Sequence, residues 1–353
     1  MEKDQFFMPA EWYHHDACWM IWPKRSDVWR NEAKNARVVF AQVAMAIAKF
    51  EPVRMATDAN LITEAKTYFS NLSNIEFVAI KSNDAWARDI APTFVINQQG
   101  ERRINHWGFN AWGGLYDDVS ADILVPNQIA EYEDIGQVIV PLILEGGSIH
   151  VNNKGVLLTT EECLLNPNRN PQYNKEQIEE FLKEYLGVHA IIWLPLGVYN
   201  DETDGHIDNM ACFLDDENIA LTWTDNKTDP QYQRSLDALH ILEAKGFKVH
   251  KIHQPDPLYV TEAEAVGWQL TENSFERKAE NRMAASYINF YMANGAIILP
   301  QFDSPYDQKA YQFLKDFYPS KEIVPIYTRE ILLGGGNIHC ITQQVPKGII
   351  NEA

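Results

Sequence analysis

The sequence is poor in cysteine and lacks the paired ligand motifs of metal sites. Its 353 residues include only four cysteines, which lie far apart. Neither a Cys-x-x-Cys nor a His-x-x-x-His pair occurs. Scattered cysteines in a long chain do not form a disulfide framework, so we expect free thiols and a reducing compartment. We also expect no metal ion and no cofactor.

Long apolar runs and basic clusters are absent as well. No apolar run could span a bilayer, and residues 1–7 contain no basic stretch followed by an apolar one. There are 49 Asp and Glu against 30 Lys and Arg, a formal net charge of −19. This balance argues against nucleic-acid and anionic-membrane partners and favours a small cation, although acidity can also serve solubility alone. We expect a soluble, cytoplasmic protein.

Amphipathic helices alternate with short apolar strands. Asn174 and Gln177 form a capping pattern before an apolar face that ends at Gly187, which predicts a helix between them. Asp229-Pro230 begins a second helix that ends before Gly246, and a third runs from 307 to about 317. Strands are predicted at 156–159, 190–193, 218–222 and 296–299.

Similar units recur along the chain. Residues 146–151 (GGSIHV) match 335–340 (GGNIHC) at four of six positions. Several such segments precede a turn, a second strand, a helix and a third strand, which favours a radial arrangement of about five strand-strand-helix-strand units in one domain. The segment 18–23 resembles the second strand of such a unit, but no first strand precedes it in the sequence. We therefore expect it to pair with the strand containing Cys340 and to close the ring.

Cys340 follows three glycines, and Ile338 and Cys340 alternate with polar neighbours as in a strand. A lone cysteine is usually a small core residue, so this thiol needs partners to indicate chemistry. His206 and Asp208 are spaced i and i+2, which places them on one side of a predicted strand. That pair could also be a satisfied histidine or a metal site, although no further ligand cluster accompanies it.

Two further acidic positions border apolar strands. Trp86 and Asp89 precede the strand at 93–96, and a buried acid there needs a cation. The cation could be Arg88, or a bound ligand that also contacts the ring of Trp86. Glu145 ends an apolar strand before two glycines, where it could cap the turn or belong to a site.

Together these positions provide a thiol, an imidazole and three carboxylates. A thiol and an imidazole are the groups needed for nucleophilic catalysis. Three acids exceed what a papain-like protease uses, but they suit a planar cation, and a guanidinium donates five N–H groups to carboxylates.

The chain resembles the agmatine deiminases of the guanidine-modifying (pentein) superfamily over nearly its whole length. The resemblance is carried by blocks at 8–12, 85–89, 110–114, 145–150, 205–210 and 334–344. It implies a five-bladed α/β propeller, a single catalytic domain over residues 1–353, and hydrolysis of agmatine to N-carbamoylputrescine and ammonia in polyamine metabolism. Ala87 departs from the bulkier or polar residue of many relatives but leaves the acids in place.

The resemblance also implies residue roles. Cys340 is the nucleophile, His206 is the general acid and base, and Asp89, Glu145 and Asp208 hold the guanidinium. The reaction then passes through a covalent amidino-thioether on Cys340. Trp86, Trp112 and Glu202 are further candidates for substrate binding.

Other activities remain open from the residues alone. Arginine and peptidyl-arginine deiminases and amidinotransferases could share Cys340 and His206, and a non-catalytic polyamine-binding protein could use the acids alone. Agmatine's amine prefers acids, which Asp201 and Glu202 beside Asp204 could supply, although these could equally be solvated loop residues. A homo-oligomer, dimer or tetramer, is a candidate assembly.

Overall fold

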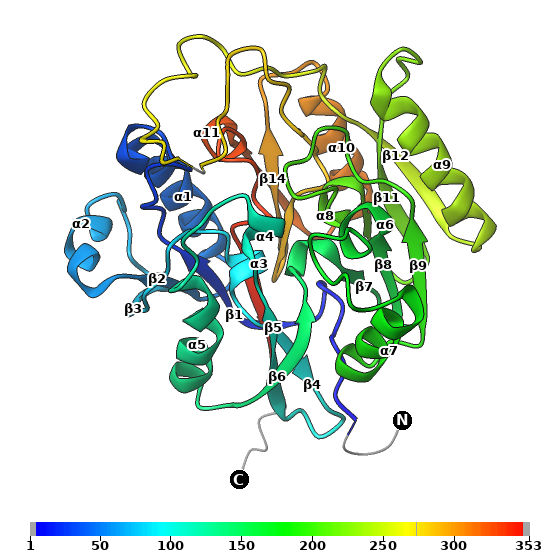
Figure 1. Ribbon diagram of the computed structural model, residues 1–353, viewed down its shortest axis with the longest axis horizontal. Coiled ribbons are helices and arrows are strands. Elements are labelled where there is room, and N and C mark those ends of the chain that lie inside the picture. Colours follow the sequence, from blue (N-terminus) through cyan, green and yellow to red (C-terminus); the bar gives the residue numbers. More distant parts are fainter. Residues whose placement is uncertain (1–4, 273, 349–353) are drawn as a thin grey trace.

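The computed structural model describes residues 5–272 and 274–348. Five small sheets form the framework (Figure 1). In order within each sheet, they contain β16 (Gln343–Pro346), β1 (His15–Ile21), β2 (Val53–Thr57) and β3 (Ile75–Ala79); β4 (Thr93–Ile96), β5 (Arg102–Gly108) and β6 (Gly136–Ile143); β7 (His150–Val151), β8 (Val156–Thr160) and β9 (Ala190–Leu194); β10 (Ala211–Phe213), β11 (Asn218–Trp223) and β12 (Lys248–His253); and β13 (Tyr291–Ala293), β14 (Ala296–Gln301) and β15 (Glu322–Tyr327).

The helices connect these strands. They are α1 (Lys34–Ile47), α2 (Ile62–Lys66), α3 (Ala87–Ile90), α4 (Ala111–Gly114), α5 (Val125–Glu133), α6 (Glu161–Leu164), α7 (Lys175–Leu186), α8 (Ile207–Met210), α9 (Pro230–Ala244), α10 (Asp307–Phe317) and α11 (Arg329–Leu332), with 3₁₀ turns η1 (Asn31–Ala33), η2 (Ala59–Leu61), η3 (Asp122–Leu124) and η4 (Gly146–Ser148). Within the described residues, none of the helices is both long and apolar enough to cross a membrane.

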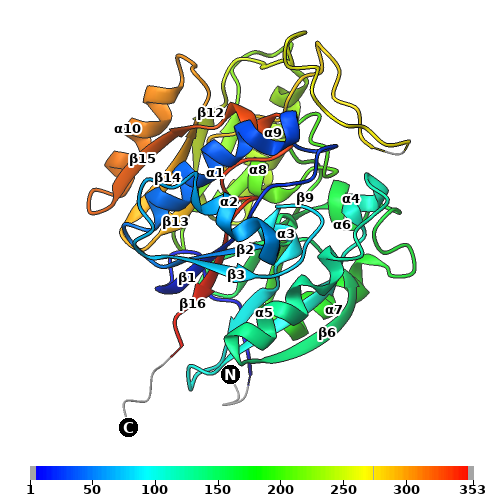
Figure 2. The same ribbon diagram turned by 90° about the vertical axis from the view of Figure 1, so that its left-hand side faces the viewer.

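All five sheets share one pattern. The first strand pairs antiparallel with the second, and the second pairs parallel with the strand that follows the helix, as β7, β8 and β9 do. The sheets follow one another around a ring: β16 contacts β4, α7 contacts β6, α9 contacts β9, and α1 contacts β14 and β15. Figure 2 shows α1 on the face nearest the viewer. A shared core joins Ala220 of β11 to Ile297 of β14. The five sheets agree with the number of units predicted from the repeats and are consistent with the five-bladed α/β propeller that the family resemblance implies.

The predicted helices are confirmed, and capping explains their ends. At the start of α7, the side chain of Asn174 accepts from the Gln177 backbone N–H (2.9 Å) and that of Gln177 accepts in return (3.0 Å). Gly187 ends the helix at φ 65°, a conformation that favours glycine. Ile178 and Leu182 are buried on its inner face. The helices α9 and α10 and the four predicted strands are also present.

The ring closes at β1, which includes residues 18–21 of the predicted closing segment. Its partner is β16, and not a strand that contains Cys340. β1 pairs antiparallel with β16, with Cys18 opposite Gln344. Cys340 itself lies in a turn before β16, so its assignment to a strand was wrong. Backbone bonds from Ile341 to Asn337 and from Thr342 to His339 hold this turn. Local bonds therefore override the alternation of apolar residues.

His206 and Asp208 likewise do not lie on a strand. His206 precedes the single-turn helix α8, and Asp208 lies within it. Comparable turns stand before the first strands of other sheets: α3 before β4, and η4 before β7. The predicted polar positions are thus on short helical turns, and in Figure 1 α3 and α8 lie toward the middle of the ribbon.

Candidate active site

One cavity brings together six of the eight candidate residues. Its walls include Trp86, Asp89, Trp112, Glu202, His206 and Cys340. Glu145 and Asp208 do not line it, but Glu145 contacts His206 and Asp208 contacts Cys340. These side chains come from loops and turns of several different sheets, so the cavity exists only when the ring is closed.

Two glycines allow the walls to approach closely. A Cβ atom at position 147 would lie 2.5 Å from Nδ1 of His206, and one at position 336 would lie 2.6 Å from the Trp86 ring. Neither distance is tolerable for a side chain. The glycines of the repeated segments therefore serve the packing of the site.

Cys340 is almost fully buried, with 7% of its surface exposed. The Asn289 amide donates to its Sγ at 3.3 Å, and Sγ lies 3.5 Å from Oδ2 of Asp208. Burial raises the pKa of the Cys340 thiol well above its ordinary value, and the charges of Asp208 and Asp89 raise it further. In the ligand-free protein the group is therefore a neutral thiol.

Alkylation should reveal this raised pKa directly. With no ligand bound, we expect the rate of Cys340 alkylation by iodoacetamide to be low at neutral pH and still rising above pH 9.0, because only the thiolate reacts. Peptide mass mapping measures the rate against pH. A rate that reaches its plateau below neutral pH would show a preformed thiolate and contradict this expectation.

His206 lies between two carboxylates. Its Nδ1 is 3.9 Å from Oδ2 of Asp89 and its Nε2 is 3.8 Å from Oε2 of Glu145. Burial alone would lower the pKa of His206, but Asp89, a hydrogen bond with Cys163 and Glu145 together raise it well above the ordinary value. His206 is accordingly an imidazolium cation that can donate a proton.

Asp89 is held by donors from two other segments. The Trp112 indole donates to its Oδ2 (2.9 Å) and the Gly147 backbone N–H donates to its Oδ1 (2.8 Å). Burial raises the pKa of Asp89, and Asp208 and Glu145 add to that rise while His206 opposes it. Arg88 was one candidate for the cation beside Asp89, but its guanidinium donates to the Gln344 side chain (2.7 Å).

Glu145 has a cationic partner that the sequence pattern did not reveal. The Nε of Arg169 donates to its Oε1 at 2.7 Å, and both side chains are fully buried. Burial opposes ionisation, but Arg169 and His206 hold the pKa of Glu145 at about 2. Arg169 lies in a loop after α6 with no periodic pattern, so its position in the sequence carries no signal of this role.

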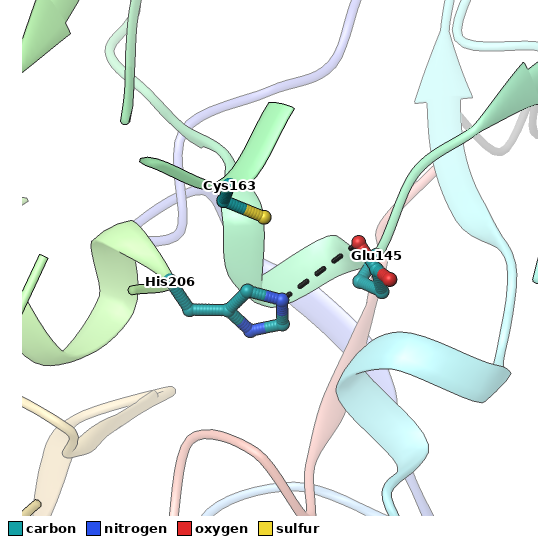
Figure 3. A group of neighbouring side chains, drawn as sticks. All are labelled: Glu145, Cys163 and His206. Atoms are coloured by element: carbon teal, nitrogen blue, oxygen red, sulfur yellow. Dashed lines mark ion pairs between the residues drawn. The ribbon is translucent and has the colours of Figure 1, made fainter. Parts of the chain in front are cut away.

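Glu145, Cys163 and His206 stand close enough to invite comparison with a metal site (Figure 3). Their donor atoms lie within 4.8 Å of one another. Arg169 already occupies one carboxylate oxygen of Glu145, and a protonated His206 has no lone pair for a metal. Burial also raises the pKa of the Cys163 thiol. These groups do not fit a metal ion.

Asp208 lies directly behind the nucleophile. Its Oδ2 contacts Nδ1 of His339 at 2.8 Å, and its Oδ1 is buried without a hydrogen-bond partner. Burial opposes ionisation, yet His339 and then His206 hold the pKa of Asp208 below its ordinary value. Asp208 is thus a buried carboxylate with one oxygen free to accept a hydrogen bond.

Glu202 lines another part of the cavity and pairs with Arg277. The Nε of Arg277 donates to Oε1 of Glu202 at 3.0 Å. Burial raises the pKa of Glu202, while Arg277 opposes the rise. Asp201 and Asp204 are engaged elsewhere: Asp201 accepts from Asn209 (2.9 Å), and Asp204 accepts from Arg169 (2.8 Å). Arg277 belongs to the long segment between β12 and β13, which gave no motif in the sequence.

Comparisons with known proteins show the family of this chain. The family model of the Porphyromonas-type peptidyl-arginine deiminases matches residues 7–346. An agmatine deiminase of Pseudomonas fluorescens is 50% identical over 354 residues, covering 97% of this chain and 96% of that protein.

Two solved structures share the fold. The agmatine deiminase of Enterococcus faecalis superposes with a TM-score of 0.93 at 38% identity, over 98% of this chain and 96% of that one. A cysteine-to-serine variant of the C. jejuni agmatine deiminase with substrate bound gives 0.86 at 28% identity, over 98% and 97%.

Proposed function

Because the chain belongs to the Porphyromonas-type peptidyl-arginine deiminase family, we propose that it hydrolyses agmatine to N-carbamoylputrescine and ammonia. Relatives about 50% identical over nearly the whole chain are named agmatine deiminases. One observation carries the proposal: a single cavity holds Cys340, His206 and Asp89 and, in addition, the carboxylate of Glu202. Agmatine has a cation at each end, and this cavity offers acids to both.

The guanidinium group would lie beside Cys340. Asp89 and Asp208 are both close to the thiol or the imidazole, and Oδ1 of Asp208 has no other partner. A carboxylate pair can accept several of the five guanidinium N–H groups and fix the plane of the ligand. Glu145 contacts Arg169 and His206, so we assign it to the orientation and charge of His206.

When the substrate binds, the Cys340 thiol loses its proton to solvent, because His206 already carries one. In the first step, the resulting thiolate forms a bond to the central guanidinium carbon. The C–N bond to one terminal nitrogen then breaks, and His206 gives its proton to that nitrogen, which leaves as ammonia. An amidino-thioether remains on Cys340. In the second step, neutral His206 takes a proton from water, and the resulting hydroxide adds to the same carbon. The C–S bond then breaks, the added hydroxyl gives its proton to the departing sulfur, and the ureido product and the Cys340 thiol are released.

The substrate itself helps to ionise the thiol. Lowering a thiol pKa by two units requires about 3 kcal/mol. One unit charge at about 4 Å supplies on the order of 4 kcal/mol at an effective dielectric of 20. A bound guanidinium therefore favours the thiolate by an amount comparable to the opposing effect of one acid, Asp208 or Asp89.

Glu202 provides a test of the amine end. We expect Glu202→Gln to raise KM for agmatine by roughly tenfold while kcat changes little, because a charged hydrogen bond remote from the reacting carbon is lost. Butylguanidine, which lacks the amine, is the matched substrate control and should show the same KM with both proteins. Steady-state ammonia assays measure kcat and KM for each substrate. An equal rise in KM for agmatine and butylguanidine would contradict the assignment of Glu202 to the amine end.

Deimination of arginine or of peptidyl-arginine is the competing activity, and the family description names the latter. The carboxylate of free arginine would meet Glu202 and Arg277, which are already paired with each other, whereas a peptide would have to enter a cavity lined by Trp86, Trp112 and Tyr116. Ammonia release measured side by side on agmatine, arginine and a peptidyl arginine distinguishes these substrates. We expect turnover of agmatine alone.

Assembly and cellular location extend the proposal. The four cysteines are buried free thiols, which supports a reducing, cytoplasmic location. The net charge of −19 supports the absence of a nucleic-acid partner. We retain one catalytic domain over residues 1–353 and a dimer or tetramer as predictions, and light scattering after size-exclusion chromatography tests the assembly.

A further inference from the structure

The N-terminal segment contributes a buried acid to the centre of the molecule. Glu11 precedes β1 and is only 4% exposed. In Figure 1 this segment, dark blue, runs from the N-terminal end toward the middle before it enters β1. Oε1 of Glu11 is 2.7 Å from Nε2 of His339 and 3.5 Å from Arg88, and its Oε2 is 3.5 Å from His150. One carboxylate thus contacts three basic side chains, which come from α3, from β7 and from the turn before β16.

His339 connects this acid to the site. Its Nε2 faces Glu11 and its Nδ1 faces Oδ2 of Asp208 at 2.8 Å. Two facing carboxylates favour a proton on each ring nitrogen. Asp208 in turn lies 3.5 Å from the Cys340 sulfur. A continuous path of contacts therefore runs from Glu11 to the nucleophile.

We propose that Glu11 is a positioning residue for the deiminase reaction: acting through His339, it keeps Asp208 ionised and fixed beside Cys340, with Oδ1 free for the substrate guanidinium. This inference rests on the proposed function. Without Glu11, His339 would face one carboxylate instead of two and would hold its second proton less firmly. A neutral His339 stabilises the Asp208 anion less, so Asp208 would accept a proton at a higher pH.

Other charges around the two acids are part of this balance. The groups facing Asp208 are His339, His206, Arg88, Asp89 and Cys340. The groups facing Glu11 are His339, His150 and Arg88, with Cys212 and Tyr318 nearby. Asp89 and His206 do not face Glu11, but Arg88 faces both Glu11 and Asp208. A variant of His339 is therefore needed to separate the path through His339 from one through Arg88.

The test compares Glu11→Gln with a matched control. Glu51→Gln removes another buried carboxylate that pairs with a histidine, His15, at 3.2 Å, and Glu51 does not line the cavity. For each protein, kcat/KM on agmatine is measured across the pH range, and melting temperature reports folding. We expect Glu11→Gln to move the acid limb of the profile upward by about one pH unit, which is about a tenfold loss on that limb, while Glu51→Gln leaves the limb unchanged.

A second variant tests whether the effect of Glu11 on Asp208 passes through His339. His339→Gln should move the acid limb in the same direction. If Glu11→Gln does not fold, the acid limb of His339→Gln alone tests the inference. In the double variant, the two effects should be clearly less than additive, because both changes break one path.

An acid limb unchanged in Glu11→Gln, a shift equal to that of Glu51→Gln, or fully additive effects in the double variant would each overturn the inference. Failure of the wild-type protein to release ammonia from agmatine would instead overturn the proposed function, so the two failures are distinguishable.

Discussion

Replacing Cys340 by serine is expected to lower kcat for agmatine by at least about 10⁴-fold, because the hydroxyl is a far weaker nucleophile than a thiolate and nothing else in the cavity can form the covalent intermediate. The side chain keeps nearly the same shape, and the surrounding acids are untouched. Agmatine should therefore still bind, and calorimetry on the serine variant measures this.

Cys18→Ala is the matched control for this substitution. Cys18 is a fully buried thiol in β1 and does not line the cavity. Its replacement should lower the melting temperature slightly and leave kcat near the wild-type value. Substantial ammonia release by Cys340→Ser, with the fold intact, would remove the thiol from the mechanism.

Replacing His206 by glutamine is expected to lower kcat by about 10²- to 10⁴-fold, the usual contribution of a general acid and base. Glutamine can donate a hydrogen bond but cannot transfer a proton to the leaving nitrogen or take one from water. The loss of the base affects the second step in particular. We therefore expect the amidino-thioether to accumulate wherever the first step still proceeds, and intact-protein mass spectrometry detects it.

The pH dependence of the wild-type enzyme follows from the same residue. His206 must be protonated for the first step, and its pKa is raised well above the ordinary value by Asp89, by Cys163 and by Glu145 despite the opposing effect of burial. Activity should therefore persist above neutral pH and decline only as pH rises through that raised pKa. If kcat/KM already declines with rising pH at values below 6.5, the ordinary pKa of histidine, His206 cannot be the acid.

Local signals in the sequence were sufficient for much of the fold. The cap at Asn174 and the glycine at 187 define α7 because both act on neighbouring backbone groups. The second strands of the blades are short apolar runs buried on both faces, such as β8, and these are readable without tertiary information. The two Gly-Gly-x-Ile-His segments, at 146–150 and 335–339, and the more loosely similar segments together predicted about five units.

The backbone conformation at the site could not be predicted from local sequence patterns. Cys340 and His206 both stand on turns, and their alternating apolar neighbours were mistaken for strands. In addition to its local backbone bonds, the turn at Cys340 is held by the His339 backbone N–H, which donates to the Asn289 side chain 50 positions away. Such a contact has no counterpart in the local pattern.

The cationic and acidic partners of the site were missed for a related reason. Arg169 reaches Glu145 across 24 positions, Arg277 reaches Glu202 across 75, and Glu11 reaches His339 across 328. Each pair is formed only when the ring of sheets closes. Charged residues in loops look alike in sequence, and only the folded chain shows which of them are buried.

The covalent intermediate on Cys340 is the central claim, and rapid quenching tests it most directly. Wild-type protein is mixed with excess agmatine, quenched in acid within one turnover, digested and analysed by mass spectrometry. We expect the peptide containing Cys340 to gain the mass of agmatine less that of ammonia. Ammonia release without this adduct at any quench time, in wild-type and His206→Gln proteins alike, would rule out the covalent route.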